Sequence, residues 1–113
     1  MLNGKDAKLL RIHVSEGDTN EGRPIYESIV DLCRAMGLAG ATVFRGVEGY
    51  GETAEMHRHR LLHHDQPILI VIVDEAEKIV AFIPEVEKLL QSGLIAMSGV
   101  RALRVTKGRE GNA

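Results

Sequence analysis

Most of the side chains that could perform chemistry lie in one stretch, Gly40–Asp65, which holds four of the chain's five histidines. Imidazole nitrogens are good ligands for Zn²⁺, Cu²⁺ and Ni²⁺. His57 and His59 would share a face of an extended segment, whereas His59 and His63 would share a face of a helix. A metal site on these three histidines is one interpretation. The other is a polar loop whose histidines are solvated.

The glycines and arginines of the same stretch favour a different chemistry, the binding of an anion. Glycine allows positive φ and a close approach of the backbone, so the N–H groups of Gly46, Gly49 and Gly51 could together form an anion nest. The guanidinium groups of Arg45, Arg58 and Arg60 could pair with a phosphate. The alternative is that the glycines only make turns and the arginines face solvent.

Length and composition restrict the classes of function. The 113 residues suffice for one domain, 1–113, and carry a formal net charge of −2. This charge, the lack of tryptophan and an aromatic content of 4 % argue against nucleic-acid binding. The longest apolar run, Ile68–Val73, is too short to cross a bilayer. A single cysteine, Cys33, and an N-terminus without an apolar leader indicate a cytoplasmic protein.

The hydrophobic pattern predicts an α+β chain in which strands and helices alternate. Strands are predicted where apolar and polar residues alternate or β-branched residues cluster, and helices where apolar residues recur at helical spacing. The region 48–65 is predicted to be a long loop, and residues 1–7 and 107–113 are expected to be mobile ends. The predicted elements are a strand over 8–15, a helix over 23–37, a strand over 41–47, a strand over 67–74, a helix that follows it, and strands over 94–97 and 100–105.

Three details concern the helices. Asp74 and Glu77 have nearly the spacing of a capping box, which predicts a carboxylate cap at the start of the second helix. Pro84 is expected to kink or split that helix, because proline has no N–H to donate and crowds the preceding turn. Cys33 lies on the apolar stripe of the first helix, so its thiol is expected to be buried.

The order of elements, β-α-β-β-α-β, is that of the ferredoxin-like fold, or split βαβ, with an antiparallel sheet and two helices on one face. The strand over 67–74 is apolar on both sides. One row is centred on Ile70 and the other on Val71. The helices can cover one of these rows, and the other would then remain uncovered. Large exposed apolar patches are usually interfaces. The sequence therefore predicts a homo-oligomer in which sheets pack face to face. The alternative is that the long loop or the tail of the same chain folds over the sheet.

The segment GATVFRGVEGYG at 40–51, followed by MHRH at 56–59, resembles the signature of the uncharacterised PII-like family called domain of unknown function 190. The similarity extends over residues 8–106 and includes KLLRIHVSEGD, GRPIYESIV, QPILIVIVDEAEKI and VRALRV. The resemblance implies a PII-like subunit of a trimer. It also implies an adenine nucleotide bound between subunits, at the base of a long loop that contacts a target. Members are often linked with small membrane transporters or channels, which are the implied partners.

These observations predict a PII-like regulatory or sensor protein rather than an enzyme, because no nucleophile–base pair is visible. The predicted ligand is a small anion, with an adenine nucleotide as first candidate, and the alternative is a trimeric metal-binding protein. Tyr50 could stack on a base, dock a partner or pack over the sheet. His57 is selected from the MHRH motif, and two arginines near the end of the chain are similar in kind to phosphate-binding residues of PII proteins. The predicted ligand-binding residues are Arg45, Gly46, Gly49, Tyr50, Gly51, His57, Arg58, Arg101 and Arg104, and the alternative metal ligands are His57, His59 and His63.

Overall fold

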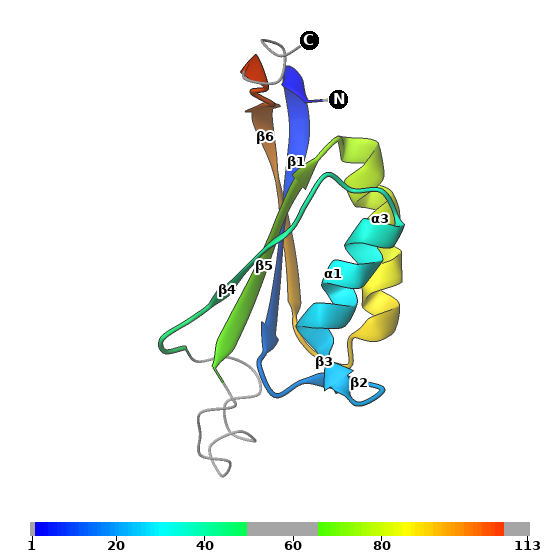
Figure 1. Cartoon of the computed structure of the whole chain (residues 1–113), viewed down its shortest axis with the longest axis vertical. Coiled ribbons are helices and arrows are strands. Elements are labelled where there is room, and N and C mark those ends of the chain that lie inside the picture. The colour runs from blue at the N-terminus through cyan, green and yellow to red at the C-terminus, as the bar shows by residue number, and fades with distance from the viewer. Residues whose placement is uncertain (1, 50–65, 108–113) are drawn as a thin grey trace.

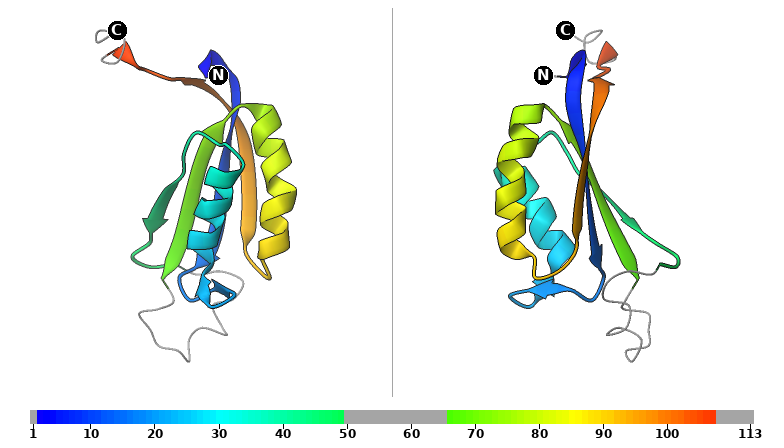
Figure 2. Two further views of the ribbon diagram at one scale, coloured as in Figure 1. Left: turned by 45° about the vertical axis from the view of Figure 1, so that its right-hand side comes forward. Right: turned by 180° about the vertical axis from the view of Figure 1, so that it is seen from behind.

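The computed structural model describes residues 2–49 and 66–107, which form an antiparallel sheet with helices on one face (Figure 1). The four strands of the sheet lie in the order β4-β5-β1-β6, which confirms the predicted ferredoxin-like fold. Figure 2 shows both helices on the same side of the sheet. In chain order the elements are β1 (Asn3–Ser15), β2 (Thr19–Asn20), β3 (Arg23–Pro24), α1 (Ile25–Ala35), β4 (Thr42–Arg45), β5 (Pro67–Asp74), α3 (Ala76–Leu89) and β6 (Leu94–Leu103).

The core lies between the two helices and the face of the sheet that they cover. Alternate residues of β5, among them Ile70, point toward the helices and are buried, as are alternate residues of β1, among them Ile12. The helices contribute Ile29 from α1 and Phe82 from α3, both fully buried. Side chains return to the same face every two residues in a strand and about every 3.6 residues in a helix. Each element therefore presents one continuous apolar row to the core.

The strands β1 and β6 are longer than the sequence predicts. β1 begins at Asn3, so that residues 3–7, expected to be a mobile end, belong to a strand. β6 runs unbroken over Leu94–Leu103 instead of forming two short strands. The two strands pair antiparallel with each other and extend beyond the helices at the upper end of Figure 1. Pairing with β1 thus carries β6 through Gly99, where strand propensity is weak.

Both helices keep their predicted places but differ in detail. α1 ends inside its predicted range, because Gly37 takes a φ of +79°, a conformation that favours glycine and stops a helix. α3 is a single helix that runs through Pro84, so the proline does not split it. Pro84 and Val80 are both exposed. The Val80 carbonyl, which loses its helical donor, therefore lies on the solvent side, where water can bond to it.

Among the described residues, Asp74 is the one buried charged side chain, with 3 % of its surface exposed. Its Oδ2 accepts a hydrogen bond from the Ala39 N–H and its Oδ1 accepts one from the Glu75 N–H, each at 2.8 Å. The predicted capping box is wrong, since Glu75 is the N-cap residue of α3 and no side-chain cap is formed. A buried carboxylate needs donors, and Asp74 meets this need by joining the segment before β4 to the start of α3.

Cys33 has the buried thiol that the sequence predicts. Only 2 % of its surface is exposed, and its Sγ donates to the Gly40 carbonyl oxygen at 3.7 Å. Burial raises the pKa of the thiol, and the negative charge of Asp74 raises it further. The thiol is therefore protonated and unreactive at neutral pH.

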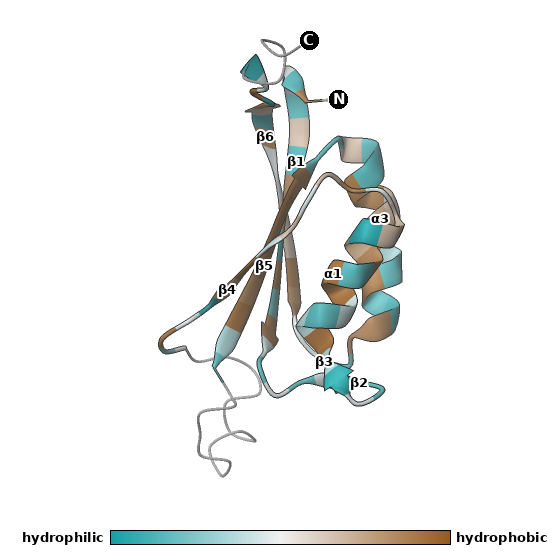
Figure 3. Cartoon of the chain, in the orientation of Figure 1, coloured by the Kyte–Doolittle hydropathy of each residue, from teal (hydrophilic) through white to brown (hydrophobic). Residues whose placement is uncertain are grey.

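The face of the sheet without helices, called here the open face, carries mostly apolar residues. Figure 3 shows that β5, which contributes to both faces, is hydrophobic along most of its length. Directly paired residues lie on the same face, which places Phe44 and Leu69 together on it, with Leu94 and His13 alongside. Phe44 is 52 % exposed and Leu94 is 59 % exposed. The predicted uncovered row of β5 is therefore present. The open face comprises Leu9, Arg11, His13, Thr42, Phe44, Leu69, Val71, Val73, Leu94, Ala96 and Ser98.

Candidate functional site

Three strand ends meet at the lower end of the sheet in Figure 1. β1 and β4 both pair antiparallel with β5, so they run in the same direction and their last residues lie near the first residue of β5. The connection between β4 and β5 leaves and returns at this point. We call the described residues here the loop base, which consists of Glu16, Arg45, Gly46, Val47, Glu48, Gly49, Gln66 and Pro67.

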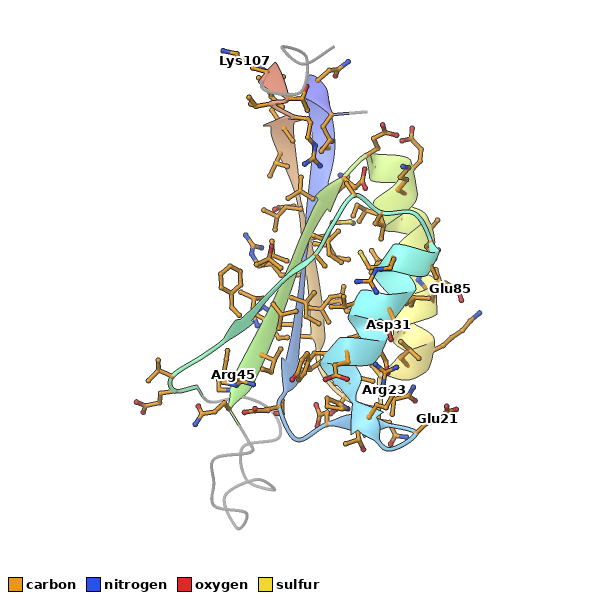
Figure 4. All side chains as sticks on the ribbon, viewed as in Figure 1. Glu21, Arg23, Asp31, Arg45, Glu85 and Lys107 are labelled. Atoms are coloured by element: carbon orange, nitrogen blue, oxygen red, sulfur yellow. The ribbon has the colours of Figure 1, made fainter. Side chains whose placement is uncertain are left out.

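An ion pair joins two of these strand ends. The Nη2 and Nε of Arg45 donate to Oε2 of Glu16 at 2.7 Å and 3.1 Å. These hydrogen bonds raise the pKa of the guanidinium, the charge of Glu16 adds to the effect, and Tyr26 makes a smaller contribution. Arg45 stands at the lower end of the sheet in Figure 4, and about half of its side chain is exposed. The loop base thus presents a partly exposed cation that already has one carboxylate partner.

The glycines of the loop base serve a close approach of two segments. A Cβ at Gly46 would lie 2.6 Å from Cγ of Pro67, and a Cβ at Gly49 would lie 2.9 Å from the same atom. Neither glycine has a positive φ. The Gly46 N–H donates to the Pro67 carbonyl at 2.7 Å, so it is not available to an anion nest. The predicted anion nest therefore lacks the N–H of Gly46, because this group donates to the backbone of Pro67.

Gln66 holds the connection at its other end. Its carbonyl accepts the Glu16 N–H at 2.8 Å. With the side-chain amide in the orientation that matches its neighbours, its nitrogen donates to the carbonyls of Gly46 and Val47 at 2.9 Å and 3.0 Å. The loop base is consequently a hydrogen-bonded platform made by β1, β4 and β5 together.

The structure brings together only some of the predicted ligand-binding residues. Arg45, Gly46 and Gly49 lie at the loop base. Arg101 and Arg104 are exposed at the opposite end of the sheet, where β6 pairs with the start of β1, and the labelled Lys107 marks that end in Figure 4. One chain therefore does not unite the two groups. The predicted residues Tyr50, Gly51, His57 and Arg58, and the alternative metal ligands His57, His59 and His63, lie outside the described residues, so these predictions stay predictions.

Sequence reasoning missed Glu16, Gln66 and Pro67. A signal for Glu16 was present, because Glu16 directly follows the first strand and Arg45 ends the second. In a β-α-β-β-α-β sheet these two strands run in the same direction, so opposite charges at their ends are expected to meet. Gln66 and Pro67 act through the backbone and their closeness to glycine, for which the sequence has no comparable signal.

Residues 2–49 and 66–107 contain no group of three histidine, cysteine or acidic side chains that could hold a metal ion. No helix in these ranges is long and apolar enough to cross a membrane.

Comparison with known sequences gives one family. The model of DUF190, described as an uncharacterised family, matches residues 7–102. A UPF0166 protein from Aquifex aeolicus (strain VF5) is 42 % identical over 98 residues, which cover 85 % of this chain and 92 % of that protein.

Solved structures of PII-like proteins have the same fold. CPII, a nitrogen regulatory PII-like protein from Thiomonas intermedia K12 bound to ADP, AMP and bicarbonate, superimposes with a TM-score of 0.62 at 20 % identity, over 88 % of this chain and 91 % of CPII. The B. subtilis GlnK–ATP complex gives a TM-score of 0.53 at 16 % identity, over 88 % of this chain and 85 % of GlnK. At such identities the likeness shows the fold.

Proposed function

Because this chain belongs to the DUF190 family and has the fold of PII-like proteins, we propose that it is a cytoplasmic regulatory protein that senses a small anionic ligand. The ligand class is an adenine nucleotide, and the site is built on the loop base. The role is one of binding and signalling rather than catalysis. The observation that carries the proposal is a partly exposed arginine, Arg45, fixed beside two glycines at the root of the β4–β5 connection.

The chemistry of the loop base supports an anionic ligand. The guanidinium of Arg45 is a planar donor that suits phosphate oxygens. The missing side chains at Gly46 and Gly49 let the backbone lie close to Pro67, which keeps this end of the sheet compact. CPII, which shares the fold, was solved with ADP and AMP, and this supports adenine nucleotides as the ligand class to test first.

The open face supports a homo-oligomer. Its apolar residues are partly or largely exposed in one chain. Full burial of a large apolar side chain stabilises an assembly by about 1.5–3 kcal/mol. A second copy of the chain presents the same surface and can cover it. We take the assembly to be a trimer, as the resemblance to PII proteins implies. In a trimer, Arg101 and Arg104 of one copy could approach the loop base of another, which a single chain does not allow.

Signalling is proposed to pass through the β4–β5 connection, which starts and ends at the loop base. A ligand at Arg45 would change the contacts that anchor the connection, and the connection would then engage a target protein. A membrane transporter or channel is the target class that the family resemblance implies.

Calorimetric titration of the protein with ATP, ADP, AMP and cyclic AMP tests the proposal. At least one nucleotide should bind, and Arg45→Ala should weaken its binding by about ten- to a hundredfold, since a hydrogen bond to a charged group contributes about 1.5–3 kcal/mol. Arg34→Ala is the matched control, because Arg34 is an exposed arginine of α1 away from the loop base. An absence of heat and of any thermal shift with all four nucleotides would refute the nucleotide ligand.

A further inference from the structure

Glu16 is held in place by its surroundings at the end of β1. Its N–H donates to the Gln66 carbonyl at 2.8 Å. The turn that follows is closed by Asp18, whose Oδ2 accepts the Ser15 N–H at 3.0 Å and whose own N–H donates to the Ser15 carbonyl at 3.0 Å. The side chain of Glu16 is only 22 % exposed. The backbone of Glu16 is thus fixed at the end of β1, with its carboxylate against Arg45.

This carboxylate occupies the Nε–Nη2 edge of Arg45, one of the two paired-donor edges of the guanidinium to which a phosphate can bind. One oxygen, Oε2, accepts from both Nε and Nη2 of Arg45. Phosphate oxygens bind arginine through the same kind of paired N–H groups. A phosphate and the Glu16 carboxylate therefore exclude each other at this edge, and they also repel each other as like charges.

We propose that Glu16 is a specificity-determining residue of the loop base, because its carboxylate competes with the anionic ligand for Arg45. This inference rests on the proposed function. Ligand binding is then an exchange, in which a phosphate replaces the carboxylate on the guanidinium. Weakly interacting anions do not displace Glu16, whereas a multiply charged phosphate group does. In the absence of ligand the same contact neutralises Arg45 and keeps its side chain at the strand end.

Removal of the charge from Glu16 tests the competition. ADP should bind Glu16→Gln about two- to fivefold more tightly than it binds the unchanged protein, the range expected from the energy of one partly exposed ion pair. Adenosine, which has no phosphate, should show no change. Glu85→Gln is the matched control, because it removes the same charge from the exposed ion pair with Lys88 on α3. The measurement is calorimetric titration at low salt, with circular dichroism to show that each variant is folded.

A second variant keeps the inference testable if the first is unstable. Glu16→Asp retains the charge, so its affinity for ADP should stay closer to that of the unchanged protein than to that of Glu16→Gln. An unchanged or weaker affinity of Glu16→Gln for ADP would overturn the inference, and so would equal tightening in Glu85→Gln. A failure of the proposed function looks different, because then neither the unchanged protein nor Glu16→Gln binds ADP. In that case pyrophosphate is the probe, and equal binding or no binding by both proteins also overturns the inference.

Discussion

The two faces of the sheet differ in what covers them. Ile70 and Val71 are adjacent in β5, yet Ile70 is fully buried beneath the helices while Val71 lies partly exposed on the open face. Both side chains are apolar and β-branched, so their own chemistry does not explain the difference. Residues 2–49 and 66–107 therefore form two apolar surfaces and cover only one of them.

The polar side chains of the two faces differ in their hydrogen-bond partners. On the covered face, the buried carboxylate of Asp74 accepts two backbone N–H groups. On the open face, the side chains of Arg11 and His13 have no hydrogen bond or ion pair with any residue in 2–49 or 66–107. A cover for the open face must therefore satisfy the guanidinium of Arg11 and the imidazole of His13 as well as the apolar residues of this face.

The largest expected effect is on assembly. Val71→Asp places a carboxylate at the centre of the open face, directly opposite Arg11 in β1, and the cost of removing both charges from water opposes the burial of this face. The variant should be a folded monomer, as measured by light scattering and circular dichroism. Val80→Asp is the control, because Val80 is exposed on α3. A wild-type protein that is a stable monomer, or a Val71→Asp variant that keeps the wild-type mass, would show that the open face is not an interface.

Ile70→Ala tests the covered face. The substitution leaves a cavity beneath the helices and should reduce the free energy of unfolding by about 2–5 kcal/mol, measured by urea denaturation at fixed protein concentration. Val80→Ala removes apolar atoms from an exposed position and should change it by about 0.5 kcal/mol or less. Similar small losses in both variants would contradict the assignment of the core.

Asp74→Asn should reduce the free energy of unfolding by less than Ile70→Ala does. An amide can accept one of the two N–H groups that Asp74 accepts, but its NH₂ group would face the other donor. We expect a loss of about 1–3 kcal/mol in the free energy of unfolding, the cost of an unsatisfied buried donor. Asp31→Asn is the control, since Asp31 makes exposed ion pairs with Arg23 and Arg34 and should lose less than about 1 kcal/mol. A loss no greater than that of Asp31→Asn would mean that the burial of Asp74 contributes little.

The fold was predictable where the hydrophobic pattern has a clear period. β5 has the bounds that the pattern predicts, and both helices lie where apolar residues recur at helical spacing. The long pairing of β1 with β6 was not predictable, because hydrogen bonds between distant strands override local propensity at Gly99 and in residues 3–7. Pro84 was expected to disturb α3, but its exposed position leaves the helix whole.

The candidate site was predictable only in part, because it depends on contacts between distant segments. Arg45 and the glycines were found from their residue types. Glu16 lies 29 positions before its partner Arg45, so the pairing follows only when the directions of the two strands that end there are considered together. Similarly, the N–H of Gly46 was counted as a free donor, because the approach of Pro67 is a product of the tertiary fold.

The buried thiol of Cys33 makes the chain a convenient background for spectroscopic labelling. It is the single cysteine of the sequence, and burial keeps it from reacting with maleimide reagents. A cysteine introduced by Glu48→Cys, at an exposed position of the loop base, would then be the one thiol to take up a fluorescent dye. Emission from that dye would report ligand-dependent changes beside the β4–β5 connection while every native residue of the core stays in place.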